Sequence, residues 1–288
     1  ALPISYIPLN QIVRRTLQRG DQVSRKTKPL QSEMGWSNTS SITVKGMSLT
    51  GAILGKLNLG DFAFLEIQSR LPTPGESAVF NALLSTLVEH GMTPMVIASR
   101  LTYLGAPESL QGAVAAGILG MGTTFAGTAE GSARLLQEAL SGEAANTPMG
   151  ELPAMAEAIV QRHIATRTPI PGIGHNLHKP IDPRTPCLFD LAAQHGLSGK
   201  YVELMKHVAL SAEHALNKPG QLPINATGAI GALSSELGIP WKLCRGLAVI
   251  GRTIGIVGHL AEELRNPLAR EIWERIEEEA SAYAQTVG

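Results

Sequence analysis

Helical periodicity of the apolar residues is the feature that most limits how this chain can fold. Between residues 76 and 89 the apolar side chains recur every three or four positions, and Gly91 follows as a C-terminal stop. Further segments of this kind cover residues 97–104, 110–119, 132–140, 151–166, 187–216 (as two helices), 228–238 and 241–264, and an amphipathic tail follows. Strand character is limited to one hairpin near Ile42 and Val44. We therefore expect an all-α fold with one minor N-terminal β-hairpin.

The charge and the hydrophobic content exclude several classes of protein. Lys plus Arg and Asp plus Glu each number 24, so the net charge is zero and the overall basic excess of a nonspecific nucleic-acid binder is absent. A hydrophobic content of 44% is too high for a disordered chain. The sequence has no stretch of roughly 18 uninterrupted apolar residues, as a membrane-spanning helix requires. We expect neither nucleic acid nor a membrane as a partner.

The cysteines and the first residues bear on the compartment. Cys187 and Cys244 allow at most one disulfide, and neither stands at metal-ligand or CxxC spacing. The opening residues lack the apolar core and the cleavage site of a signal peptide. Six basic residues between positions 14 and 28 are interpreted as a solvated arm or a first helix. We expect a reducing, cytoplasmic location.

The common signatures of phosphate, zinc and serine-nucleophile sites do not occur in the sequence. There is no GxxxxGK[ST], no HExxH and no GxSxG. The eight histidines include one close pair, His175 and His178, and no carboxylate stands at a convincing ligand spacing from it. We therefore expect no metal site.

The loop 171–184 carries the residues best suited to chemistry. Its glycines, Gly172 and Gly174, allow the backbone to approach a ligand closely, while Lys179 and Arg184 are suited to phosphate or carboxylate. His175 titrates near neutral pH and is suited to moving a proton. A surface loop with capping residues is the alternative interpretation of the same pattern.

The loop resembles the GxGH…DPR signature of the citrate synthase superfamily, and three other segments resemble family motifs in the right order. They are EHGMTPMVIASR (89–100), LPINATGAIGALSSELGIP (222–240) and GLAVIGRTIGIVGHLAEE (246–263). Residues 42–76 are similar to the family's N-terminal region. The length makes the chain most similar to the citryl-CoA lyase branch, which is also akin to the C-terminal module of ATP citrate lyase.

The resemblance implies an architecture. The family is an all-α homodimer in which each chain forms a large and a small helical domain, with the active site in the cleft and residues contributed across the dimer. The large domain would comprise residues 1–127 and 229–288, and the small domain, residues 128–228, would be inserted into it.

The resemblance also implies roles for individual residues. His175 matches the histidine that binds the keto or alcohol oxygen and moves its proton. His90, Arg184 and Arg252 match positions that hold substrate carboxylates, a task that suits a guanidinium group because it binds carboxylates through two parallel hydrogen bonds. Arg265 is a further candidate for a carboxylate clamp, contributed by the neighbouring subunit.

For coenzyme A the resemblance implies a second group of residues. Lys179 stands where a basic residue contacts the coenzyme, and the backbone of 171–174, with Gly172, Ile173 and Gly174, matches the stretch that lines the adenine pocket. No permanently bound cofactor is implied, because the coenzyme A thioester is itself the substrate or product.

The chain departs from the family pattern at two positions. Phe125, in 125-FAGTAEG-131, replaces the histidine of an HGGAN-like motif that polarises the thioester carbonyl, and ATP citrate lyase has a similar phenylalanine. Thr227, in Asn225-Ala226-Thr227, replaces the aspartate that exchanges a proton with the acetyl methyl group. A threonine hydroxyl is no base near neutral pH without an activating partner. No Asp or Glu occurs from Leu222 to Ser235 to replace it.

These features predict a coenzyme A thioester carbon-carbon lyase. It would cleave a citryl-CoA-like 3-hydroxyacyl-CoA by a retro-aldol reaction, giving acetyl-CoA and a keto acid, with His175, Thr227 and Phe125 around the reacting atoms. One alternative is a variant aldolase or condensing enzyme that acts on a different carbonyl partner. The other is a non-catalytic acyl-CoA binding protein that has lost the catalytic aspartate.

Overall fold

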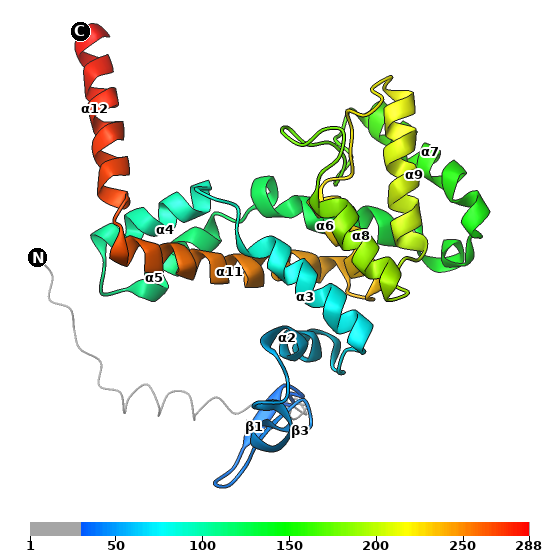
Figure 1. The fold of residues 1–288 in the computed structure, drawn as a ribbon, viewed down its shortest axis with the longest axis horizontal. Helices are drawn as coiled ribbons and strands as arrows, with labels where there is room; N and C mark the ends of the chain where they lie inside the picture. The colour runs from blue at the N-terminus through cyan, green and yellow to red at the C-terminus, as the bar shows by residue number, and fades with distance from the viewer. Residues whose placement is uncertain (1–29, 288) are drawn as a thin grey trace, which may run out of the picture.

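The computed structural model describes residues 30–287, so the basic cluster between positions 14 and 28 lies outside the described residues. A bundle of helices forms the body, which confirms the predicted all-α class (Figure 1). The helices are α2 Leu59–Gln68, α3 Pro74–Val88, α4 Pro94–Gly105, α5 Leu110–Leu119, α6 Thr123–Ala139, α7 Leu152–Thr166, α8 Arg184–Gln194, α9 Lys200–Ala215, α10 Ala226–Glu236, α11 Trp241–Arg265 and α12 Ala269–Val287. A π-helical turn, Leu49–Ile53, and two 3-10 turns, Gly142–Asn146 and Met149–Glu151, complete the helical elements of the described residues.

The N-terminal sheet has one more strand than the predicted hairpin. It consists of β1 Gly35–Ser37, β2 Ile42–Val44 and β3 Met47–Ser48, in the antiparallel order β1-β2-β3. Lys45 and Gly46, with φ angles of 48° and 76°, form the two-residue turn between β2 and β3. Positive φ at both positions is typical of the tight hairpin turn whose twist matches the strands. The third strand is too short to produce an alternating pattern in the sequence.

Local sequence signals set where several helices begin. Thr73 caps α3 by accepting a hydrogen bond from the Glu76 N–H, and the Glu76 side chain accepts one from Thr73 N, which completes a capping box. By contrast, α6 begins nine residues before the predicted start at Ser132 and runs from Thr123. Its first turns consist of small residues, which carry little apolar periodicity for a prediction to use.

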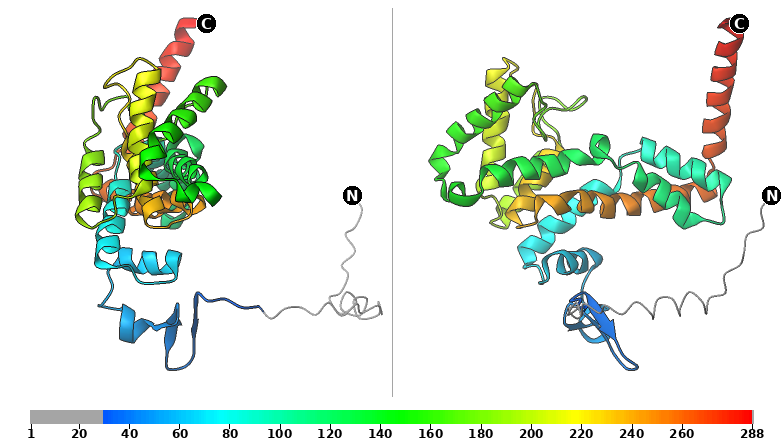
Figure 2. Two further views of the ribbon diagram at one scale, coloured as in Figure 1. Left: turned by 90° about the vertical axis from the view of Figure 1, so that its right-hand side faces the viewer. Right: turned by 180° about the vertical axis from the view of Figure 1, so that it is seen from behind.

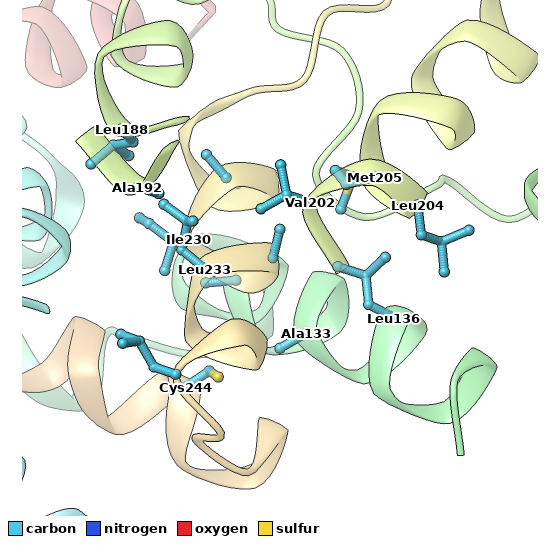
Figure 3. Close-up of a cluster of buried hydrophobic side chains, with 14 of the residues drawn as sticks. Ala133, Leu136, Leu188, Ala192, Val202, Leu204, Met205, Ile230, Leu233 and Cys244 are labelled. Atoms are coloured by element: carbon cyan, nitrogen blue, oxygen red, sulfur yellow. The ribbon is translucent and has the colours of Figure 1, made fainter. Parts of the chain in front are cut away.

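One helix, α10, lies at the centre of the main core (Figure 3). Ile230 and Leu233 of α10 are surrounded by apolar residues from four other helices. These are Leu188 and Ala192 of α8, Val202 and Met205 of α9, Ala133 and Leu136 of α6, and Cys244 of α11. Because α10 is buried on all sides, the segment that precedes it, 222–225, is held rigidly.

The long helix α11 runs along the body and brings its middle close to the end of α3. A Cβ atom added at Gly251 would lie 2.9 Å from the carbonyl oxygen of Leu84, and one added at Gly255 would collide with the backbone of Val88. The two helices therefore approach at a distance that only glycine permits. This crossing places Arg252 of α11 beside the turn that follows α3.

By length and hydropathy α11 also qualifies as a membrane-spanning helix, although 44% of its most apolar 18-residue window is buried inside the protein. It packs against α3, α4, α5 and α6 and carries the buried ionic side chains Arg252 and Glu263. A mostly buried core helix can have the same length and hydropathy as a membrane-spanning helix. In Figures 1 and 2, α12 projects from the body at the end of α11, and the sheet with α2 extends from the opposite side.

The predicted division into a large and a small domain stays a prediction. Its boundaries, at 127/128 and 228/229, fall within the continuous helices α6 and α10. One apolar core also contains residues from both proposed parts, for example Phe80 and Leu204. Any division of this chain would therefore share helices between the two parts.

Candidate active site

The loop between α7 and α8 is bonded to the segment that precedes α10. The N–H of Gly174 donates to the carbonyl oxygen of Pro223 at 2.7 Å, and the N–H of Asn225 donates to that of Gly172 at 3.0 Å. The Asn225 side chain also donates to the Gly174 carbonyl at 2.7 Å. Gly172 has a φ angle of +85°, and a Cβ atom there would lie 2.5 Å from the Cα of Gly228. The first glycine of the motif is therefore required by close packing as well as by backbone conformation.

Hydrogen bonds fix the proton position of the His175 ring. Its Nδ1 accepts the backbone N–H groups of Leu177, at 3.1 Å, and of His178, at 3.0 Å. A neutral imidazole whose Nδ1 is an acceptor carries its hydrogen on Nε2. Burial lowers the pKa of His175, and the charges of His178, Arg184 and His90 lower it further, while Asp182 opposes them. His175 is therefore neutral near pH 7 and presents Nε2–H as a donor.

Arg184 is held along one edge of its guanidinium group by Asp182. Nε donates to Oδ1 of this carboxylate at 2.9 Å and Nη2 donates to Oδ2 at 2.8 Å, a bidentate pair. Asp182 is fully buried and also accepts the N–H of Ala226 at 3.0 Å. Burial raises the pKa of Asp182, but the hydrogen bonds from Arg184 and Ala226 outweigh it and lower that pKa to about 2.

This pairing orients Arg184 toward His175, because Nη2 of Arg184 lies 3.4 Å from Nε2 of His175. The sequence analysis assigned no role to Asp182 and so missed it as the anchor of the arginine. The DPR triplet itself was the available signal, since a carboxylate two residues before an arginine can pair with it.

His90 lies in the turn between α3 and α4, and its side chain is exposed. Glu89 holds the turn, because its Oε1 accepts the N–H groups of His90 at 2.9 Å and of Gly91 at 2.5 Å. The charge of His90 contributes to the lowered pKa of His175, so the two histidines lie within electrostatic reach of each other.

Arg252 is buried, with 8% of its surface exposed, and its Nη1 has no hydrogen-bond partner. Burial lowers the pKa of this guanidinium, while the charge of Glu89 opposes the effect. An unpaired buried donor of this kind costs free energy unless an acceptor reaches it. Because Glu89 belongs to the His90 turn, its charge places this turn within electrostatic reach of Arg252.

Thr227 stands in the first turn of α10, and its hydroxyl donates to Oδ1 of Asn225 at 2.7 Å. The same amide oxygen caps the helix by accepting the N–H groups of Thr227 and Gly228. An amide oxygen is not a base, so the structure supplies no activating partner for this hydroxyl.

The remaining predicted residues are exposed and take no part in the hydrogen bonds described above. Phe125 is 52% exposed in the first turn of α6. Lys179 is exposed in the loop, and Arg265 is exposed at the end of α11. Cys187 and Cys244 are free thiols, and no group of three or more potential metal ligands occurs within residues 30–287.

The chain belongs to the citrate synthase family, because residues 46–275 match the family described as citrate synthase, C-terminal domain. Within it, the chain resembles the citryl-CoA lyase of Hydrogenobacter thermophilus, with 31% sequence identity, a TM-score of 0.74, and coverage of 83% of this chain and 88% of that one. The ATP citrate lyase of Methanothrix soehngenii, solved with citrate and coenzyme A, shares the fold at 20% identity and a TM-score of 0.68, over 92% of this chain and 42% of that one.

Among sequences, a probable ATP-citrate synthase of Dictyostelium discoideum is 26% identical over 261 residues, or 84% of this chain. The chain spans only 39% of the length of that relative. The predicted family and its citryl-CoA lyase-like branch are thus confirmed.

Proposed function

We propose that this protein is a coenzyme A thioester carbon-carbon lyase that cleaves a citryl-CoA-like 3-hydroxyacyl-CoA. The observation that carries the proposal is the arrangement of His175 against Arg184. A neutral donor at Nε2 and a fixed guanidinium lie 3.4 Å apart, which suits an oxygen that alternates between hydroxyl and keto forms beside a carboxylate. The similarity to the Hydrogenobacter thermophilus citryl-CoA lyase supports this reaction class.

In this reaction Nε2–H of His175 donates a hydrogen bond to the carbinol oxygen, whose proton passes to water, and the bond between the carbinol carbon and the thioester α-carbon breaks. Its electron pair passes to the thioester as an enolate, which takes a proton at carbon to give acetyl-CoA. In the reverse direction, Nε2–H stabilises the negative charge that develops on the carbonyl oxygen as the bond forms, and water supplies the proton of the hydroxyl. The two backbone donors at Nδ1 and the nearby Arg184 disfavour a positive imidazolium, so the neutral ring keeps Nε2–H as a donor toward this oxygen.

The carboxylates of the keto acid part would bind to arginine and histidine. Asp182 occupies Nε and one hydrogen of Nη2 of Arg184, so Nη1 and the second hydrogen of Nη2 remain for a ligand. At Arg252 the buried and unpaired Nη1 would be satisfied by a carboxylate oxygen. His90 would complete the clamp. Lys179 and the backbone around Gly174 would hold the coenzyme A part.

The proton for the enolate needs a source other than a carboxylate at position 227. Thr227 donates its hydroxyl to Asn225, so we propose that water protonates the enolate carbon at this site. Phe125 would pack against the thioester in place of a polar donor, and backbone N–H groups would stabilise the enolate oxygen.

The test is incubation of the purified protein with citryl-CoA and related 3-hydroxyacyl-CoAs, with acetyl-CoA and keto acid quantified by chromatography. We expect cleavage of at least one ester, and a loss of about 100-fold or more in kcat for His175→Ala, because one positioned donor to an oxygen that gains negative charge contributes about that factor. His214→Ala is the matched control, because His214 is exposed near the end of α9 and lies outside the loop that carries His175. Failure to cleave any of the esters would contradict the proposal.

A non-catalytic acyl-CoA binding protein is the second candidate, and the Thr227–Asn225 hydrogen bond favours it. It predicts stabilisation of the folded protein by coenzyme A or acetyl-CoA in a thermal-shift assay, without turnover. Cleavage by the wild-type protein would exclude this candidate.

A further inference from the structure

A series of hydrogen-bonded charged and polar side chains connects the start of α12 to the His90 turn. Arg100 of α4 is fully buried, and its Nη1 donates to Oε2 of Glu263 at 2.6 Å. Glu263 also accepts the N–H of Ala269, at the start of α12, at 2.9 Å. The other terminal nitrogen of Arg100, Nη2, contacts Glu262 and lies 2.9 Å from Nδ1 of His259.

The arginine decides which nitrogen of His259 carries the hydrogen. A guanidinium group is always charged and can only donate, so Nδ1 of His259 accepts from Arg100. The neutral ring then carries its hydrogen on Nε2, which lies 3.0 Å from Oε1 of Glu89. Donation therefore runs in one direction, from Arg100 through His259 to Glu89.

Glu89 is the last side chain of this hydrogen-bonded series and the one that lies next to the proposed site. Its side chain is 55% exposed, whereas that of His259 is 12% exposed, so the histidine is the fixed partner and the carboxylate depends on it. The Oε1 atom that accepts from His259 also accepts the N–H groups of His90 and Gly91. Without His259, an exposed glutamate would exchange these bonds with water.

We propose that His259 and Glu89 are positioning residues, which hold the backbone of the His90 turn through a hydrogen-bond relay of fixed direction. The role of His90 toward a substrate carboxylate rests on the proposed function, while the relay itself does not. The groups that face His259 are Arg100 from α4, Glu89 from the end of α3, and Glu262 of its own helix, whose Oε2 lies 3.8 Å from Nδ1. The sequence analysis assigned no role to His259.

The first experiment needs no substrate. Imidazole ¹⁵N spectra of the ligand-free protein at pH 7.5 report which ring nitrogen carries the hydrogen, and a His259→Gln variant assigns the signal. We expect the hydrogen of His259 on Nε2. A ring with its hydrogen on Nδ1, or one that is fully protonated at this pH, would overturn the relay.

The second experiment tests positioning by amide hydrogen exchange at Gly91. In His259→Leu, which neither donates nor accepts, we expect exchange at Gly91 to become about tenfold faster. His259→Gln keeps one donor and one acceptor and should restore most of the protection. His214→Leu, at an exposed position near the end of α9, is the matched control and should leave Gly91 unchanged. Unchanged exchange in a folded His259→Leu variant would refute the role of His259.

Kinetics separate this inference from the proposed function. With an ester that the wild-type protein cleaves, His259→Leu should raise KM about tenfold with a smaller effect on kcat, because a carboxylate contact is made before and during the reaction. Equal KM values for the wild-type and His259→Leu proteins would contradict the positioning of His90. Absence of cleavage by the wild-type protein would contradict only the proposed function, since the spectra and the exchange rates still decide the relay.

Discussion

At the residue scale, the site depends on partners that fix which atoms of each side chain remain free. Two backbone N–H groups take Nδ1 of His175, and Asp182 takes two nitrogens of Arg184. What remains is Nε2–H of His175 and, on Arg184, the two hydrogens of Nη1 and the second hydrogen of Nη2. The motif residues act through these remaining atoms, so the partners matter as much as the motif.

Asp182 should make the stability of the protein depend on pH and on Arg184. Its pKa falls from 3.8 to about 2 on folding, so this carboxylate stabilises the folded state above pH 4 and the contribution is lost as the pH falls toward 2. In Arg184→Gln the buried carboxylate loses its partner, and we expect the free energy of unfolding at pH 7 to fall by about 3 kcal/mol.

Urea unfolding at pH 7 and at pH 3 measures both effects. The loss caused by Arg184→Gln should shrink at pH 3, where the unpaired carboxyl is protonated. Arg134→Gln, which removes an exposed pair with Glu138, is the control and should change stability by less than about 1 kcal/mol. An equal loss in the two arginine variants would show that burial of the pair has no effect.

Thr227→Asp should introduce a proton-exchanging carboxylate into the site. The position is in the first turn of α10, where a negative charge is favoured by the dipole of the helix. We expect deuterium from solvent to enter the methyl group of acetyl-CoA at least about tenfold faster than in the wild type, as measured by mass spectrometry. Thr227→Asn has the same shape without the charge and should show no gain. Equal rates in all three proteins would mean that position 227 does not face the methyl group.

At the element scale, the crossing of α3 and α11 is what brings the His90 turn to Arg252. Gly255 packs against the backbone at Val88, whereas Gly258, one turn later, faces open space. Two glycines of the same helix therefore differ completely in what a methyl group would meet.

Gly255→Ala should destabilise the protein by about 3 kcal/mol, because rigid backbone would have to move. Gly258→Ala should instead stabilise it by about 0.5–1 kcal/mol, because alanine favours the helix. Thermal and urea unfolding of both variants provide the measurement. A stable Gly255→Ala protein would mean that α3 and α11 are farther apart than the structure indicates.

At the scale of the whole molecule, α11 leaves apolar residues on its outer side. Ile254, Val257 and Leu264 are 48%, 44% and 67% exposed, and their spacing places them on one stripe of the helix. An exposed stripe of this kind is typical of a surface that another protein covers. Together with the homodimer that the sequence resemblance implies, it leads us to propose a second copy of this chain across α11.

If the expected dimer forms across α11, a double substitution, Ile254→Glu and Val257→Glu, should give a monomer in light scattering after gel filtration. Charges placed in an apolar interface cannot be desolvated without a partner. Leu210→Glu, at an exposed position on α9, is the control and should leave the mass unchanged. A wild-type protein that is already monomeric would refute the expected dimer.

Much of the fold was predictable because its signals are local. Apolar periodicity predicted the helices from α3 to α12, and four ordered motifs predicted the family. The errors occurred where local signals are weak, as in the small residues at the start of α6 and the two-residue strand β3.

The sequence by itself determined the helical class, the family and the set of candidate residues around the GxGH…DPR loop. Only the tertiary structure decided which atoms of those residues are free and what holds them. Arg100 and Glu263 are 163 positions apart, and His259 and Glu89 are 170 apart. The physical reason is that hydrogen-bond direction and burial depend on partners from distant segments, which helical periodicity and motif spacing do not encode.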